Sequence, residues 1–266
     1  DQEFYMVQPK GFVDPKDANK VCKLQRSIYG LKQASRSWNQ RFDKVIKSFG
    51  FIQTYGEACI YKKVSGSSVA FLILYVDDIL LIGNDVDLLN SVKEYLNNSF
   101  SMKDLGKAAY ILGIKIYRDR SKRQISLSQS TYLDKVLKRF GMEDSKKGFL
   151  PMLPNTTLSK TQSPTSAEDR ERMSKTPYAS AIGSLMYAML CTRPDIAYVV
   201  SLTSRYQSDP GVEHWTAVKN ILKYLNRTKE MFLVYGGDEQ LVVKGYVDAS
   251  FDTDKDDSKS QTGYVY

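Results

Sequence analysis

The sequence predicts an α+β protein in which antiparallel hairpins alternate with amphipathic helices. Residues 59–64 and 69–76 are strand-like runs joined by the polar segment 65–68, as expected for a hairpin. Residues 35–49 carry apolar side chains three and four positions apart, which is typical of an amphipathic helix. That apolar stripe consists of Trp38, Phe42, Val45, Ile46 and Phe49.

The remaining elements follow from the same two periodicities. Asp77-Asp78 interrupts the apolar pattern, which resumes over residues 79–82, so a further strand is expected there. Apolar side chains at helical spacing predict four more helices, at residues 86–97, 132–140, 177–206 and 211–227. A second hairpin is expected from residues 110–117 and 124–127, and a last β unit from about residue 241.

Composition limits the classes of function. The 266 residues include 38 Lys and Arg against 30 Asp and Glu, and the net charge of +8 favours polyanionic partners. Residues 101–148 carry a balance of +7 and residues 237–257 one of −5, which indicates a polyanion track and a possible cation site. The longest apolar run, residues 69–76, is too short to span a membrane.

Cysteine and histidine are too sparse for the metal sites and disulfide frameworks that they commonly build. Cys22, Cys59 and Cys191 lie far apart, so neither a disulfide framework nor a CxxC site is supported. His214 is the one histidine, which excludes a multi-histidine metal site, and we interpret it as structural.

Asp77 and Asp78 are the strongest candidates for chemistry. Two adjacent carboxylates at the end of buried strands repel each other, and a divalent cation relieves that repulsion. Carboxylate oxygens suit Mg²⁺, and two such ions can activate an attacking hydroxyl and stabilise a leaving oxygen in phosphoryl transfer. A solvated Asp-Asp turn is the alternative, but the apolar strands on both sides favour the metal site.

Tyr75-Val76-Asp77-Asp78 between apolar strands resembles the catalytic box of reverse transcriptases. Further segments resemble motifs of the copia-type LTR retrotransposon Pol polyprotein, in the same order along the chain. These segments are residues 5–12 (YMVQPKGF), 24–38 (LQRSIYGLKQASRSW), 102–106 (MKDLG), 112–114 (LGI), 192–196 (TRPDI) and 214–215 (HW).

The resemblance implies a mechanism and a set of site residues. Asp77 and Asp78 would be catalytic metal ligands for Mg²⁺ or Mn²⁺. The incoming deoxynucleoside triphosphate would lie at Tyr29, Gly30, Lys32 and Gln33, although a simple turn before the helix is the alternative for this segment.

The other implied partners are an RNA template, a DNA primer and the rest of the Pol polyprotein, in a virus-like particle or the nucleus. The backbone of primer and template would be gripped by Lys115, Arg118, Lys122 and Arg123. A solvated basic face is the alternative for these four residues.

The resemblance also divides the chain into five parts. These are a partial palm (1–100), the end of the palm and the thumb (101–150), a linker (151–175), a helical connection (176–236) and the start of a ribonuclease H-like domain (237–266). Asp248 would be the first acid of a partial ribonuclease H metal site. Asp252, Asp254 and Asp256 do not match an EF-hand loop, and we interpret them as a solvated acidic loop.

Two functions therefore stay open. The family places a further palm acid upstream of its YM-x-QP segment, which begins here at Tyr5, so we expect this chain to be a fragment that lacks that ligand. The first function is a piece of an RNA-directed DNA polymerase, inactive as the fragment. The alternative is a non-catalytic, basic nucleic-acid-binding remnant of a retrotransposon.

Overall fold

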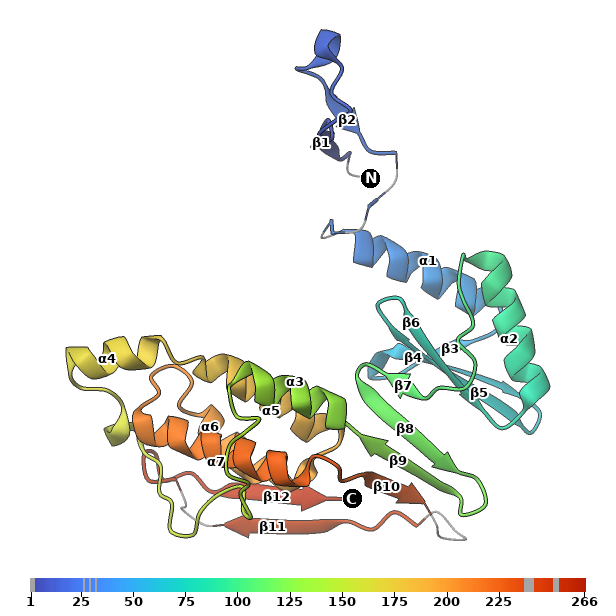
Figure 1. Cartoon of the computed structure of the whole chain (residues 1–266). Coiled ribbons are helices and arrows are strands. Elements are labelled where there is room, and N and C mark those ends of the chain that lie inside the picture. The colour runs from blue at the N-terminus through green and yellow to red at the C-terminus, as the bar shows by residue number, and fades with distance from the viewer. Residues whose placement is uncertain (1–2, 26, 29, 32, 237–241, 251–253) are drawn as a thin grey trace. The chain divides into compact units, whose positions relative to one another are not determined.

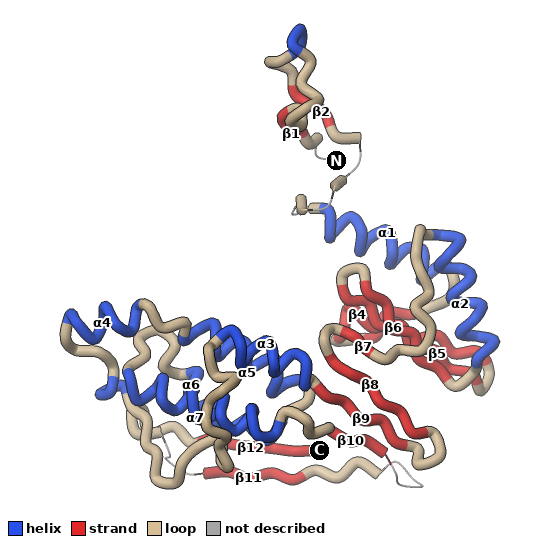
Figure 2. The backbone as a smooth tube through the Cα atoms, in the orientation of Figure 1, coloured by secondary structure: helices blue, strands red, loops and turns tan. Residues whose placement is uncertain are grey.

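The computed structural model describes residues 3–25, 27–28, 30–31, 33–236, 242–250 and 254–266. The chain divides into two compact units, Asp1–Gly106 and Lys107–Tyr266. Both units combine helices with antiparallel strands (Figures 1 and 2). The α+β class predicted from the sequence is therefore confirmed.

A small hairpin begins the first unit. Strand β1 (Tyr5–Val7) pairs with β2 (Val21–Lys23), and the loop between them contains the short helix η1 (Pro15–Asp17). The amide of Gln8 donates to the backbone carbonyls of Asp17 and Lys20, and so closes this loop.

The core of the first unit lies between two helices and one face of a four-stranded antiparallel sheet. The sheet runs in the order β3 (Ile52–Thr54), β4 (Glu57–Ser65), β5 (Ser68–Tyr75) and β6 (Asp78–Gly83). The helices are α1 (Ala34–Ser48) and α2 (Val86–Ser99), which lie on the same side of this sheet in Figure 1. The contact between the two helices and the sheet buries every second residue of a strand, because successive side chains of a strand point to opposite faces of the sheet. The buried set is Phe42, Ile46, Phe51, Tyr61, Ala70, Leu72, Leu74, Val92 and Leu96.

Local sequence explains where α2 begins. The Asp85 carboxylate accepts from the backbone N–H groups of Asp87 and Leu88, which have no partner within the helix. Gly83 ends β6 directly before this cap. A side chain at Gly83 would place its Cβ 2.7 Å from the Val69 carbonyl oxygen, so only glycine fits.

The second unit packs four helices around one apolar core. These are α3 (Ser130–Arg139), α5 (Tyr178–Cys191), α6 (Ala197–Ser204) and α7 (Val212–Thr228). A second four-stranded sheet, in the order β10 (Leu233–Gly236), β9 (Gln124–Ser128), β8 (Ile114–Asp119) and β7 (Tyr110–Ile111), belongs to the same unit.

Two features of the second unit differ from the sequence-based expectations, and a third concerns the segment expected to be a linker. The helix expected at 177–206 is broken into α5, the short helix η3 (Pro194–Ile196) and α6, because a proline cannot continue a helix. Strand β10 pairs with β9 across about a hundred residues of sequence, and local periodicity did not predict it. The segment 151–175 contains η2 (Lys160–Gln162) and α4 (Ala167–Ser174) and buries Leu158 and Met173.

The last element is a hairpin of β11 (Tyr246–Ser250) and β12 (Gln261–Val265). The acidic segment before β12 is not a freely solvated loop, contrary to the interpretation of its sequence. Asp256 accepts from the backbone N–H of Lys160 at 2.9 and 3.0 Å, and Asp254 pairs with Arg205. Asp252 lies outside the described residues.

Candidate active site at the turn between β5 and β6

Val76 and Asp77 form a two-residue turn between β5 and β6. Tyr75 pairs with Asp78 across the base of the turn, so the apolar segments 69–76 and 79–82, which were expected to be strands, form the two arms of a hairpin. Val76 has a φ of +56°, which is unusual for a β-branched residue, whereas Asp77 does not have a positive φ. A positive φ at the first central position alone is the pattern of a type II′ turn.

Both carboxylates of the predicted catalytic pair are accessible. Asp77 and Asp78 are exposed, and Asp77 lies at the tip of the hairpin. Leu72 and Leu74 point into the core, so Tyr75 and its cross-strand partner Asp78 lie on the sheet face away from α1 and α2. Two acidic side chains are thereby presented to solvent from a rigid sheet.

A contact from α1 reaches this turn. The indole Nε1–H of Trp38 donates to the backbone carbonyl oxygen of Val76 at 2.5 Å. The ring of Trp38 is held between Phe42, with centroids 5.7 Å apart, and Phe100, with centroids 5.1 Å apart. The sequence placed Trp38 on the apolar stripe of the helix but gave no sign of this bond.

The predicted nucleotide-binding segment comes immediately before α1. Tyr29 and Lys32 lie outside the described residues. Gly30 has a φ of +95°, a conformation that favours glycine, and no atom of the described residues lies within 4 Å of where its Cβ would be. Gln33 is exposed and directly precedes the helix.

The four predicted nucleic-acid-binding residues lie on or next to β8 and are all exposed. Strand alternation directs Lys115 and Arg118 to opposite faces of the sheet, so the structure does not bring these two together. Lys122 and Arg123 lie in the turn to β9, where Lys122 is 3.9 Å from Asp119. Tyr110 and Tyr117 share the face of Lys115 and are 58% and 57% exposed.

Asp248, the predicted ribonuclease H acid, lies in β11 opposite Gly263 and is exposed. Among the described residues, no group of three or more His, Cys, Asp or Glu side chains is placed to hold a metal ion. Asp77 and Asp78 therefore offer a chemically suitable but partial set of oxygen ligands for a divalent cation.

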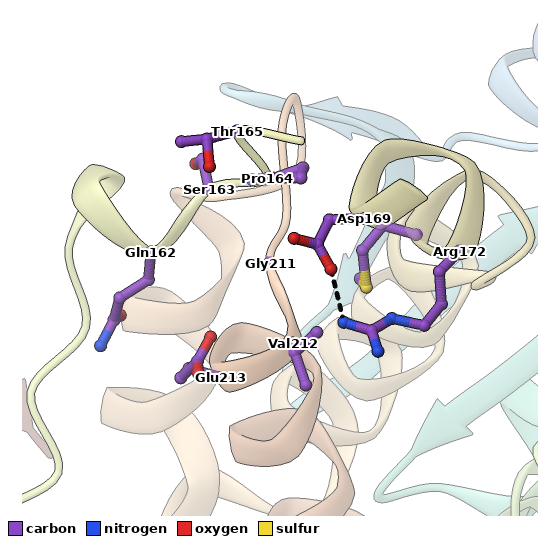
Figure 3. A pocket seen from close by; sticks show the side chains of 10 residues that line it. Gln162, Ser163, Pro164, Thr165, Asp169, Arg172, Gly211, Val212 and Glu213 are labelled. Atoms are coloured by element: carbon purple, nitrogen blue, oxygen red, sulfur yellow. Dashed lines mark hydrogen bonds and ion pairs between the residues drawn. The ribbon is translucent and has the colours of Figure 1, made fainter. Parts of the chain in front are cut away.

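A separate polar pocket of about 230 Å³ lies in the second unit, beside the start of α7 (Figure 3). It is lined by residues 162–165 and 211–213 and by Asp169, Arg172 and Met173. Asp169 and Arg172 form an ion pair with each other at 2.7 Å. None of the predicted site residues lines this pocket. No helix in the described part of the chain is long and apolar enough to cross a membrane.

Comparison with known proteins agrees with the motifs. The family described as reverse transcriptase (RNA-dependent DNA polymerase) matches residues 1–154. The Retrovirus-related Pol polyprotein from transposon TNT 1-94 of Nicotiana tabacum is 47% identical over all of this chain and 20% of its own length. The corresponding polyprotein from transposon RE1 of Arabidopsis thaliana is 36% identical over 99% of this chain and 17% of its own length.

A shorter relative is covered almost completely. The putative transposon Ty5-1 protein of Saccharomyces cerevisiae is 34% identical over all of this chain and 84% of its own length. No solved structure matches the chain.

An acidic turn between two strands of an antiparallel sheet, together with the family match, defines the class of the protein: the chain belongs to the reverse transcriptase family. Its relatives place it more narrowly, in the reverse transcriptase region of copia-type retrotransposon Pol polyproteins. The chain spans about a fifth of the length of the two plant polyproteins.

Proposed function

We propose that this chain contributes the metal-binding turn of an RNA-directed DNA polymerase within a longer Pol polyprotein. The observation that carries the proposal is the exposed Asp77-Asp78 pair on a tight turn of a sheet whose other face is packed. The helices on the packed face hold the strands, so the turn presents both carboxylates in a fixed place.

Asp77 and Asp78 would hold Mg²⁺ or Mn²⁺ through their hard carboxylate oxygens. A divalent ion bound there would supply the Lewis-acid chemistry that phosphoryl transfer from a nucleotide to a primer hydroxyl requires. Tyr29, Gly30, Lys32 and Gln33 receive the deoxynucleoside triphosphate. Gly30 supports this assignment because its open, positive-φ backbone allows a ligand to approach closely.

Primer and template lie along the second unit. We propose that Lys115 and the turn residues Lys122 and Arg123 contact the phosphates of an RNA–DNA hybrid, with Arg118 on the reverse face of β8. In this proposal residues 1–100 are a partial palm and residues 101–150 the end of the palm and the thumb. Residues 151–175 are a linker, 176–236 a helical connection and 237–266 the start of a ribonuclease H-like domain.

One observation favours the second candidate function, a non-catalytic nucleic-acid-binding remnant. The described residues supply no third ligand beside Asp77 and Asp78, and Asp248 likewise has no group of acids around it. Magnesium requires a near-octahedral set of ligands, so we propose that polymerisation needs a further acid from elsewhere in the polyprotein.

Primer extension separates the two functions. The assay uses Mg²⁺, all four deoxynucleotides and three proteins: this chain, a longer Pol segment that includes the residues before it, and the longer segment carrying Asp77→Asn. We expect extension by the longer segment alone. Asp87→Asn, which removes an exposed acid from α2, is the matched control and should leave extension unchanged.

Two results would contradict the proposal. Template-dependent extension by this chain that is lost in its own Asp77→Asn variant would show that no further acid is needed. Equal extension by the longer segment with and without Asp77→Asn would remove Asp77 from the catalytic site.

A further inference from the structure

We propose that Trp38 is a positioning residue that fixes the Asp77-Asp78 turn through the hydrogen bond from its indole N–H to the carbonyl of Val76. The role in metal binding rests on the function proposed above; the role in holding the turn does not. This hydrogen bond joins two residues that lie far apart in the sequence, one on α1 and one in the β5–β6 turn.

The turn needs an external support. Val76 holds a positive φ with a β-branched side chain that is 54% exposed, so little of its own packing keeps it there. A residue in a sparsely populated conformation persists only where its surroundings determine it. The Val76 carbonyl belongs to the peptide group that joins Val76 to Asp77, so a donor bound to that oxygen restricts the rotation of this peptide group. The orientation of the peptide group sets the direction in which both carboxylates leave the hairpin.

Trp38 is well placed to provide that support because its own ring cannot turn freely. Its indole meets the Phe100 ring edge-on, with planes 69° apart, and tilts against the fully buried Phe42. The guanidinium of Arg41 lies 5.6 Å from the Phe100 ring and covers the same cluster. A donor held by two neighbouring rings loses little freedom when it forms a hydrogen bond.

The helix that carries Trp38 is itself fixed to the sheet and α2. The Tyr61 hydroxyl donates to the Asp43 carboxylate at 3.1 Å, which joins β4 to α1. Tyr95 of α2 contacts the other end of α1, where its hydroxyl donates to the Val45 carbonyl at 3.2 Å. Helix α1 is thus fixed to both β4 and α2, and Trp38 is the residue of this helix that bonds to the acidic turn.

The same helix begins immediately after Gln33, the last residue of the proposed nucleotide-binding segment. Trp38 lies little more than one turn into the helix, at 3.6 residues per turn. The start of the helix and the indole bond therefore connect Gln33 to the acidic turn.

Two replacements separate the hydrogen bond from the packing of the ring. Trp38→Phe keeps an aromatic ring but removes the donor. Replacement of Trp38 by 3-benzothienylalanine, which has sulfur in place of the indole N–H, keeps the size of the ring and removes only the donor. Trp215→Phe makes the same change in the other unit, where that ring packs against Phe140 and Tyr178, and is the matched control.

The first measurement is amide hydrogen exchange in the peptide that spans residues 75–79 of the 266-residue chain. Loss of one such hydrogen bond should speed exchange there by about fivefold in both Trp38 replacements, with no change in Trp215→Phe. The second measurement is the affinity for Mn²⁺, followed by electron paramagnetic resonance. This affinity should weaken by about the same factor in both Trp38 replacements.

The outcomes are separable. Unchanged exchange in the benzothienylalanine protein overturns the proposal, even if Trp38→Phe loosens the turn, because packing alone would then account for the effect. Faster exchange in both Trp38 replacements, in a chain that binds no Mn²⁺, would support the positioning role while showing that Asp77 and Asp78 do not hold the ion without a further acid. Equal Mn²⁺ affinity in all proteins, together with faster exchange, would overturn the effect of Trp38 on the carboxylates.

Discussion

The imidazole of His214 lies flat on the phenol ring of Tyr206, with centroids 4.0 Å apart and planes only 9° apart. His214 is fully buried at the start of α7, where its Nδ1 accepts from the backbone N–H of Gly211 at 2.8 Å. Its Nε2 faces the Ser159 carbonyl at 3.1 Å, so this nitrogen carries the proton and the ring is neutral. The His-Trp motif thus has a structural role here.

This arrangement predicts a loss of stability in mild acid. Burial lowers the pKa of His214, although the Ser159 carbonyl and the carboxylates of Glu213, Asp256 and Asp209 oppose the shift. A histidine with a lowered folded-state pKa stabilises the protein at pH values above its unfolded pKa of about 6.5 and loses that contribution as the pH falls.

The measurement is the free energy of unfolding of the chain between pH 7.5 and 5.5. The contribution of His214 to the free energy of unfolding can change by at most about 1.4 kcal/mol per pH unit. The control is His214→Phe, which retains the ring contact with Tyr206 but cannot titrate, and which should show a flatter pH profile despite a lower stability. Parallel profiles for the two proteins would remove His214 as the cause.

A second prediction concerns the positive φ of Val76. A non-glycine residue in this conformation lowers the stability of the folded state by about 1–3 kcal/mol. Replacement by glycine removes this strain, but the greater freedom of glycine in the unfolded chain offsets part of the gain. Val76→Gly should therefore raise the free energy of unfolding by up to about 1 kcal/mol in chemical denaturation. Val64→Gly is the matched control, because Val64 is similarly exposed (56%) but has no positive φ. Its expected effect is destabilising, and the same sign for both substitutions would argue against strain at Val76.

Much of this region could be predicted from the sequence because its signals are local. Apolar runs on both sides of Asp77-Asp78 predicted the two strands of this hairpin, and the stripe from Trp38 to Phe49 predicted α1. The hydrogen bond between Trp38 and Val76 could not be predicted, because nothing in the sequence around either residue indicates that the two come together in the fold. The same holds for Asp256 and Lys160, whose contact turns a segment of acidic composition into a docked loop.

A third prediction concerns the TRPDI motif, in which Arg193 is only 4% exposed. Its guanidinium donates to the Asp195 carboxylate through two nitrogens, at 2.9 and 2.7 Å, and to the hydroxyl of Thr228 at 2.6 Å. Burial alone would raise the pKa of Asp195, but the hydrogen bonds from Arg193 and Tyr224 outweigh it and hold the pKa below its ordinary value.

Lysine cannot reproduce this planar set of donors. Arg193→Lys should cost about 2 kcal/mol of unfolding free energy. Arg172→Lys tests the same change in an ion pair whose arginine side chain is 63% exposed, and should cost less than about 0.5 kcal/mol. Similar losses of unfolding free energy in the two variants would mean that burial of the Arg193–Asp195 ion pair does not increase its contribution to stability.

The last prediction concerns the face of the β7–β10 sheet that we propose to contact nucleic acid. Lys115 shares its face with two exposed tyrosines, which suit a contact with sugar and phosphate, whereas Arg118 shares the opposite face with the half-buried Ile116. A duplex lying on the tyrosine face reaches Lys115 and the turn residue Lys122 but not Arg118. The salt dependence of binding counts such contacts, because each neutralised phosphate adds about 0.9 to the slope of log affinity against log salt.

We therefore expect Lys115→Ala and Lys122→Ala each to lower this slope by about 0.9, and Arg118→Ala to leave it unchanged. Binding of a primer–template duplex would be titrated at several salt concentrations for each protein. Arg170→Ala, in α4, and Lys175→Ala, at the C-cap of α4, each remove one cation and are the controls for net charge alone. A lower slope in Arg118→Ala with no change in Lys115→Ala would place the duplex on the opposite face. Slopes that fall equally in every variant, controls included, would mean that the basic residues act only through the overall charge of the chain.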